Sequence, residues 1–134
     1  MQQIEETGGP VLGYRAVSVL TALMVLVQPI LAGQFVYGIE PDMKDVHAVV
    51  GQSLHITVFI QLVLAFFARR TFGIGLAVFN LILLILITMQ AGIGFSDNRD
   101  VLAVHIPLGT VLLTLAVFAA FLAFFDLRAQ RRLD

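Results

Sequence analysis

The pattern of hydrophobic and polar positions is dominated by four long apolar segments. They cover residues 13–38, 46–68, 72–95 and 101–125. Their only charged residue is Arg15, near the start of the first. A helix needs about 20 residues to cross the hydrocarbon core of a bilayer, and each segment is at least that long. The chain is therefore predicted to be an all-α integral membrane protein, with four transmembrane helices in a single domain over residues 1–134.

The connections between the segments are short, so we expect consecutive helices to be antiparallel neighbours in an up-down-up-down bundle. Both chain ends then lie on the same side of the membrane. That side would carry most of the basic residues, namely Arg15, Arg69, Arg70, Arg128, Arg131 and Arg132. By the positive-inside rule, the N- and C-termini are predicted to be cytoplasmic in a multi-pass protein of the cell membrane.

Composition supports the same class. The chain is 59% hydrophobic and 13% charged, whereas a soluble domain carries about 25% charged residues. A net charge of −1 gives no basic surface for nucleic acid, so the expected partner is the lipid bilayer. The absence of cysteine from the sequence excludes disulfides, thiolate metal sites and covalent haem attachment through Cys-x-x-Cys-His.

One nine-residue pattern, V-H-x-x-x-G-x-x-L, occurs at both Val46–Leu54 and Val104–Leu112. The second and fourth helices start on the same side of the membrane and run parallel. His47 and His105 are therefore expected at similar depth, near the outer surface. The repetition indicates two pseudo-repeated hairpins, formed by the first two and the last two helices.

Two neutral imidazoles at one depth are typical of a haem iron with two axial histidines. We expect haem b between His47 and His105. Gly51 and Gly109, one helical turn further on, would leave space for the edge of the ring.

Lys44 and Arg99 lie at the same end of the helices and are candidate partners for the haem propionates. Two other interpretations of the histidines stay open. One is a zinc site that includes Asp45, and the other is ordinary hydrogen bonding between helices.

His55 is about 12 Å deeper than His47 at 1.5 Å per residue. With Gln28, it could line a secondary quinone or substrate pocket, relay a proton, or ligate a metal across a subunit interface. The alternative is a hydrogen bond to Gln28, Gln90 or a backbone carbonyl. Below this depth few polar residues remain beyond Gln61, Asn80 and Thr114, so the inner half is expected to be mostly packed hydrocarbon.

The layout resembles one four-helix half of the haem A synthase family. The resemblance rests on a histidine near the outer end of the second and fourth helices, His47 and His105, and on Gln34 and Gln90 at the ends of the first and third. It implies that both histidines are haem ligands and that the protein forms oligomers. The family's glutamate three residues before the histidine is Lys44 here.

Three functions follow as hypotheses. The first is a haem-binding protein, with the iron held by two histidines, in electron transfer or haem handling. The second is a half-size haem A synthase-like oxidase. The third is a non-catalytic accessory subunit of a larger respiratory or transport complex. Gly73, Gly75, Gly92 and Gly94 are small residues on which such a unit could form a homo-oligomer.

Overall fold

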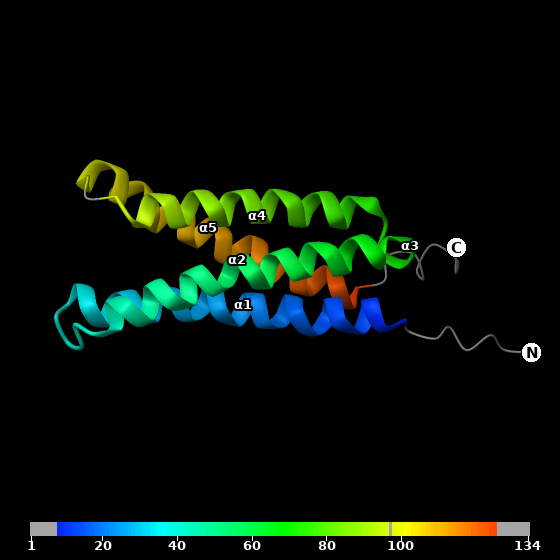
Figure 1. Ribbon diagram of the computed structural model, residues 1–134, viewed down its shortest axis with the longest axis horizontal. Helices are drawn as coiled ribbons and strands as arrows, with labels where there is room; N and C mark the ends of the chain where they lie inside the picture. Colours follow the sequence, from blue (N-terminus) through cyan, green and yellow to red (C-terminus); the bar gives the residue numbers. More distant parts are fainter. Residues whose placement is uncertain (1–7, 97, 126–134) are drawn as a thin grey trace, which may run out of the picture.

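The computed structural model describes residues 8–96 and 98–125, except for the side chain of Arg99. Four long helices and one short helix make up the fold (Figure 1). Their bounds are Gly9–Val36 (α1), Met43–Phe67 (α2), Arg69–Phe72 (α3), Ile74–Gly94 (α4) and Arg99–Phe124 (α5). The long helices are each apolar and long enough to cross a membrane. The prediction of an all-α bundle compatible with multiple membrane crossings is thus confirmed.

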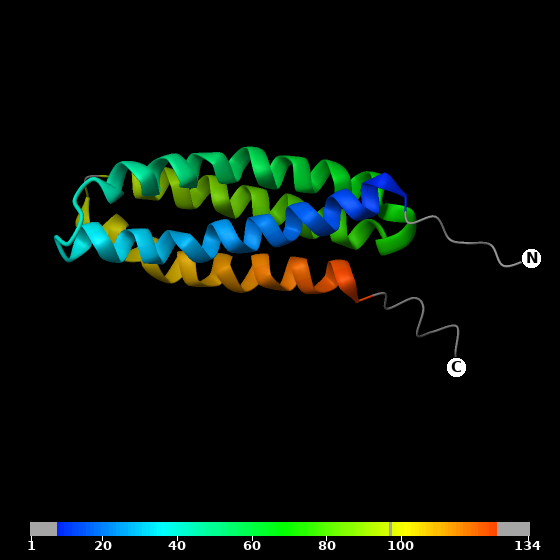
Figure 2. The ribbon, with the colours of Figure 1, turned by 90° about the horizontal axis from the view of Figure 1, so that it is seen from below.

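The long helices lie side by side and alternate in direction (Figures 1 and 2). α1 packs against α2 and α5, and α4 packs against the same two helices. α2 and α5 are therefore diagonal to each other, and they run parallel. We call the end with the α1–α2 and α4–α5 turns the hairpin end, and the end with α3 the termini end.

The helix ends differ slightly from the predicted ones, for local reasons. α1 begins at Gly9 because Pro10 is well placed in a first helical turn, where no N–H is needed. α5 begins at Arg99 because the Asn98 side chain accepts a hydrogen bond from the Asp100 N–H at 2.9 Å. The link expected at residues 69–71 is the helical turn α3, which ends where Gly73 adopts a φ of 86°.

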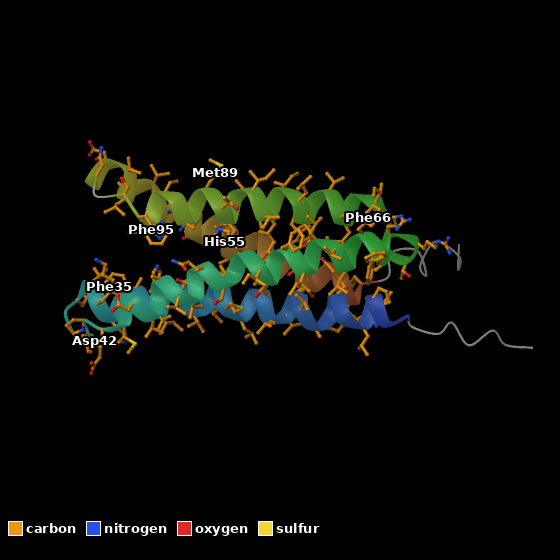
Figure 3. All side chains as sticks on the ribbon, viewed as in Figure 1. Phe35, Asp42, His55, Phe66, Met89 and Phe95 are labelled. Carbon is orange, nitrogen blue, oxygen red and sulfur yellow. The ribbon has the colours of Figure 1, made fainter. Side chains whose placement is uncertain are left out.

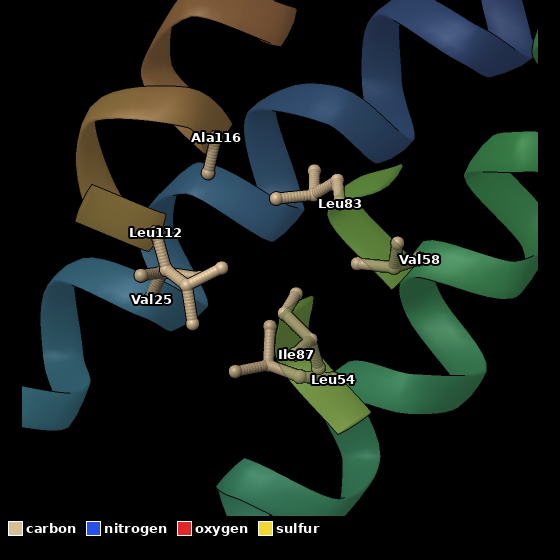
Figure 4. Packing of buried hydrophobic residues seen from close by; sticks show 7 residues of the cluster. All are labelled: Val25, Leu54, Val58, Leu83, Ile87, Leu112 and Ala116. Carbon is tan, nitrogen blue, oxygen red and sulfur yellow. The ribbon is translucent and has the colours of Figure 1, made fainter. Parts of the chain in front are cut away.

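In the described part of the chain, the core contains two apolar clusters. The residues of the larger one come from the middle of each long helix, and Figure 4 shows how they pack. This cluster takes side chains from all four long helices: Val25, Leu54, Val58, Leu83, Ile87, Leu112 and Ala116. Outward-facing positions are also apolar, and Phe66 and Met89 are among the large side chains exposed there (Figure 3). Exposed apolar side chains on every long helix are what a lipid-facing surface requires.

Candidate functional site

The structure brings the two histidines of the repeated pattern together at the hairpin end. His47 of α2 and His105 of α5 face each other across the diagonal of the bundle, with ring centroids 6.2 Å apart and ring planes at 59°. Both residues are partly buried. Phe35 contacts the His47 ring edge-on, with centroids 5.5 Å apart. The two rings can approach each other because the two histidines lie at similar depth, as predicted.

In the first hairpin, Gln28 and His47 form a reciprocal pair across neighbouring helices. The Nδ1 of His47 lies 3.1 Å from the Gln28 backbone oxygen. In return, the Gln28 side-chain amide donates to the His47 backbone oxygen at 3.3 Å. Each residue thus binds the other through one backbone and one side-chain group. We call this arrangement the Gln–His clamp.

The second hairpin repeats the clamp with Gln90 and His105. The Nδ1 of His105 is 3.1 Å from the Gln90 backbone oxygen, and the Gln90 amide donates to the His105 backbone oxygen at 2.8 Å. The Gln90 Oε1 is buried and has no hydrogen-bond partner among the described residues. The two clamps therefore make the same two contacts, but the bond from the glutamine amide to the histidine backbone is shorter in the second.

The clamps determine which nitrogen of each imidazole is available. A backbone oxygen can only accept a hydrogen bond, so Nδ1 must carry the ring proton of the neutral histidine. The lone pair then resides on Nε2. Within residues 8–96 and 98–125, Nε2 of His47 and of His105 has no hydrogen-bond partner. Each clamped ring therefore offers one free ligand nitrogen.

The ring spacing matches the length expected for two imidazoles that share one metal ion. With metal–nitrogen bonds of about 2 Å and nitrogens about 1 Å from the ring centre, two opposed ligands have centroids about 6 Å apart. The observed separation is 6.2 Å. Within the described part of the chain, no group of three or more His, Asp, Glu or Cys side chains could hold a metal ion. The zinc site with Asp45 thus lacks its ligand set, whereas a porphyrin would itself supply the remaining iron ligands.

The glycines of the pattern have neighbours that the sequence did not reveal. A Cβ on Gly51 would be 3.7 Å from the Gln28 amide nitrogen, and one on Gly109 would be 3.2 Å from that of Gln90. Each glycine thus adjoins the glutamine of its own clamp, in ordinary contact at Gly51 and more tightly at Gly109. Gly94 lies against the His105 ring, because a Cβ added to Gly94 would be 2.8 Å from Cε1 of His105.

Other predicted residues lie apart from the histidine pair. The glutamine of the first clamp is Gln28, six residues before Gln34; the backbone oxygen of Gln34 instead accepts the N–H groups of Ile39 and Glu40 in the turn. Lys44 is exposed at the hairpin end, and the side chain of Arg99 lies outside the described part of the structure.

His55 is partly exposed on α2 (Figure 3). Its Nδ1 lies 3.2 Å from the backbone oxygen of Gln52 in the same helix. Its contact is therefore a backbone carbonyl, one of the alternatives that the sequence left open.

A second polar cluster lies toward the termini end. Thr21 donates to Gln61 Oε1 at 2.6 Å, Gln61 Nε2 to Asn80 Oδ1 at 2.6 Å, and Asn80 Nδ2 to the Tyr14 hydroxyl at 3.0 Å. All four side chains are fully buried. Gln61 and Asn80, two of the few polar residues expected in this half, thus belong to one network beside the second apolar cluster. Tyr14, Ser18 and Thr21 recur on one face of α1, and this spacing was the available signal.

No family model, curated protein or solved structure matches this chain. The resemblance to the haem A synthase family thus remains a prediction from its motifs. The functional argument depends on the geometry of the histidine pair.

Proposed function

We propose that this protein binds haem b between His47 and His105 and takes part in electron transfer or haem handling at the outer face of the cell membrane. The observation that carries the proposal is the pair of clamped imidazoles, 6.2 Å apart, with both Nε2 atoms free. Metal-ligating histidines typically donate their second ring N–H to a carbonyl or carboxylate. Both histidines of this pair already make that bond.

The proposed role of each residue follows from its contacts. His47 and His105 would provide the axial nitrogens, and the diagonal placement of α2 and α5 would put one on each face of a flat ring. When bound, haem b supplies a one-electron iron couple. Because His47 and His105 would both hold the iron, the chemistry that the group would supply is electron transfer and not the reaction of a substrate bound at the iron.

The proposed orientation follows the charge pattern. Basic residues predominate at the termini end in the sequence, so that end would face the cytoplasm and the histidine pair the outside. Lys44 is exposed at the hairpin end, within the region where propionates would emerge. A basic side chain there would pair with a carboxylate at the membrane surface.

The deciding experiment is a reduced-minus-oxidised spectrum of the full chain purified in detergent. We expect the α-band of low-spin haem b in the wild type. In His47→Ala and His105→Ala, haem content should fall at least tenfold, because one axial bond is lost. His55→Ala is the matched control and should keep its haem. No α-band, or unchanged haem in both variants, would exclude the proposal.

The same preparation separates the other two hypotheses. Conversion of haem O to haem A in a host that lacks its own synthase would indicate the half-size haem A synthase-like oxidase. Isolation as a colourless, stoichiometric subunit of a larger respiratory complex would indicate the accessory role.

A further inference from the structure

We infer that Gln28 and Gln90 are positioning residues, which set the tautomer and the direction of His47 and His105 through the two Gln–His clamps. The inference rests on the proposed function where it concerns haem. Its structural part, the control of the free imidazole nitrogen, applies to the protein without haem as well.

Each clamp fixes its histidine at two points. The Gln28 backbone oxygen accepts a hydrogen bond from Nδ1–H of His47 at 3.1 Å, and the Gln28 side-chain amide donates to the His47 backbone oxygen at 3.3 Å. One bond alone would leave the ring free to swing about the side-chain torsions. Two bonds between the same pair of residues fix both the relative rotation and the relative height of α1 and α2. The ring is then held in place, with Nε2 free of a hydrogen bond, before any ligand binds.

The clamp also affects the ligand strength of the nitrogen. A hydrogen bond from Nδ1–H to a carbonyl makes the imidazole a stronger electron donor at Nε2. A stronger donor stabilises ferric relative to ferrous iron and lowers the midpoint potential. The glutamines thus connect helix packing to the redox property of a cofactor that they need not touch.

The two clamps should not contribute equally. The amide bond to the histidine backbone is 2.8 Å for Gln90 and 3.3 Å for Gln28. The space beside Gly109 is also tighter than that beside Gly51, since an added Cβ would be 3.2 Å rather than 3.7 Å from the amide. We therefore expect His105 to depend more strongly on its glutamine than His47.

A third glutamine provides a matched control. Gln52 is on α2, between His47 and His55 in sequence, but it is exposed on the outside of the bundle. Changing Gln52 to Met alters composition and hydropathy as Gln28→Met or Gln90→Met does. It leaves both clamps in place.

The first test uses the full chain without haem, labelled with ¹⁵N-histidine and reconstituted in nanodiscs at alkaline pH. In the wild type and in Gln52→Met, nitrogen chemical shifts should report the Nδ1–H tautomer for His47 and His105. Gln28→Met and Gln90→Met keep the backbone oxygen that accepts from Nδ1 but lose the amide bond that holds the two helices in register. The Nδ1–H bond of the altered hairpin should therefore loosen, and its histidine should gain a population of the Nε2–H tautomer. Unchanged tautomers in both variants would overturn the inference.

The second test uses haem titration and redox potentiometry of the same proteins. Loss of an outer-shell partner typically weakens metal binding 10- to 100-fold, so we expect about a tenfold loss or more in Gln90→Met and less in Gln28→Met. Because the Nδ1–H bond of the altered hairpin loosens once its amide bond is lost, the midpoint potential should rise in both and stay constant in Gln52→Met. If Gln90→Met fails to fold, Gly109→Ala displaces the same amide with the glutamine retained.

The outcomes separate the two proposals. If the wild type binds no haem but the tautomers still change, the proposed function fails and the positioning role stands. If the wild type binds haem through both histidines, and the glutamine variants keep tautomer, affinity and potential, the positioning role fails alone.

Discussion

The two polar regions of the bundle contain similar residue types but are built differently. At the hairpin end, the same Gln–His clamp occurs once in each hairpin, is partly buried and leaves an imidazole nitrogen unpaired. Toward the termini end, Tyr14, Thr21, Gln61 and Asn80 form one continuous hydrogen-bonded chain that is fully buried.

The second region draws on only three of the four long helices. α5 contributes alanines at this depth: Ala116, Ala119 and Ala123 are fully buried. Small side chains let helices approach closely, while hydrogen bonds link the other three. This region therefore holds helices together, and its polar side chains form hydrogen bonds with one another.

The difference shows how to interpret polar residues inside a membrane. Each is a functional hypothesis by default, because burying it in hydrocarbon is costly. What distinguishes the regions is whether the polar atoms satisfy one another. A closed network indicates structure, whereas repeated groups with an unused lone pair indicate a place for a ligand. Val25 and Leu54 of the larger apolar cluster lie between the two polar regions along α1 and α2.

The largest effect is expected from breaking the closed network. Gln61→Leu leaves the Thr21 hydroxyl and the Asn80 side chain without their buried partner, which should cost about 1–3 kcal/mol of stability. Unfolding in mixed micelles, followed by circular dichroism, measures the loss. The exposed Gln52→Leu is the control and should change stability little.

The same variant tests whether the regions are separate. Gln61→Leu should keep the haem affinity of the folded protein, because neither clamp contains Gln61. Haem loss at full stability would contradict the division drawn here.

An intermediate effect is expected at Gly94, which lies against the His105 ring. Gly94→Ala would put a Cβ 2.8 Å from Cε1 of His105, so the ring must move away from the position in which we propose that it binds haem. We expect about tenfold weaker haem binding, or about 1.4 kcal/mol, in a direct titration. Gly92→Ala has open space beside it and should bind haem as the wild type does. Equal affinities of the two variants would remove the steric argument.

The fold could be predicted well from the sequence because the bilayer simplifies it. Four apolar segments of membrane-spanning length, joined by short links, allow few arrangements. The approach of His47 and His105 also followed from topology, since α2 and α5 had to run parallel. The sequence did not reveal how each helix is rotated about its own axis, and this rotation decides which side chain lies beside a glycine.

That missing information explains the other differences. Gln34 and Gln28 are both glutamines in the second half of α1, and only packing shows that Gln28 reaches His47. The network of Tyr14, Thr21, Gln61 and Asn80 could not be predicted because these residues are far apart along the chain and no short motif connects them. Tyr14 and Asn80 meet only once α1 and α4 are placed across the bundle.

The smallest effect should distinguish the two copies of the pattern from each other. Alanine in place of either glycine gains the same helix propensity, up to about 1 kcal/mol, so this gain cancels when Gly109→Ala and Gly51→Ala are compared. The added Cβ meets the Gln90 amide at 3.2 Å but the Gln28 amide at only ordinary contact distance, 3.7 Å. Gly109→Ala must therefore push its amide away from the His105 backbone oxygen. Haem binding should weaken about threefold, roughly 0.6 kcal/mol, relative to Gly51→Ala in a parallel titration. The opposite order would mean that the first clamp, despite its longer bond, is the tighter one.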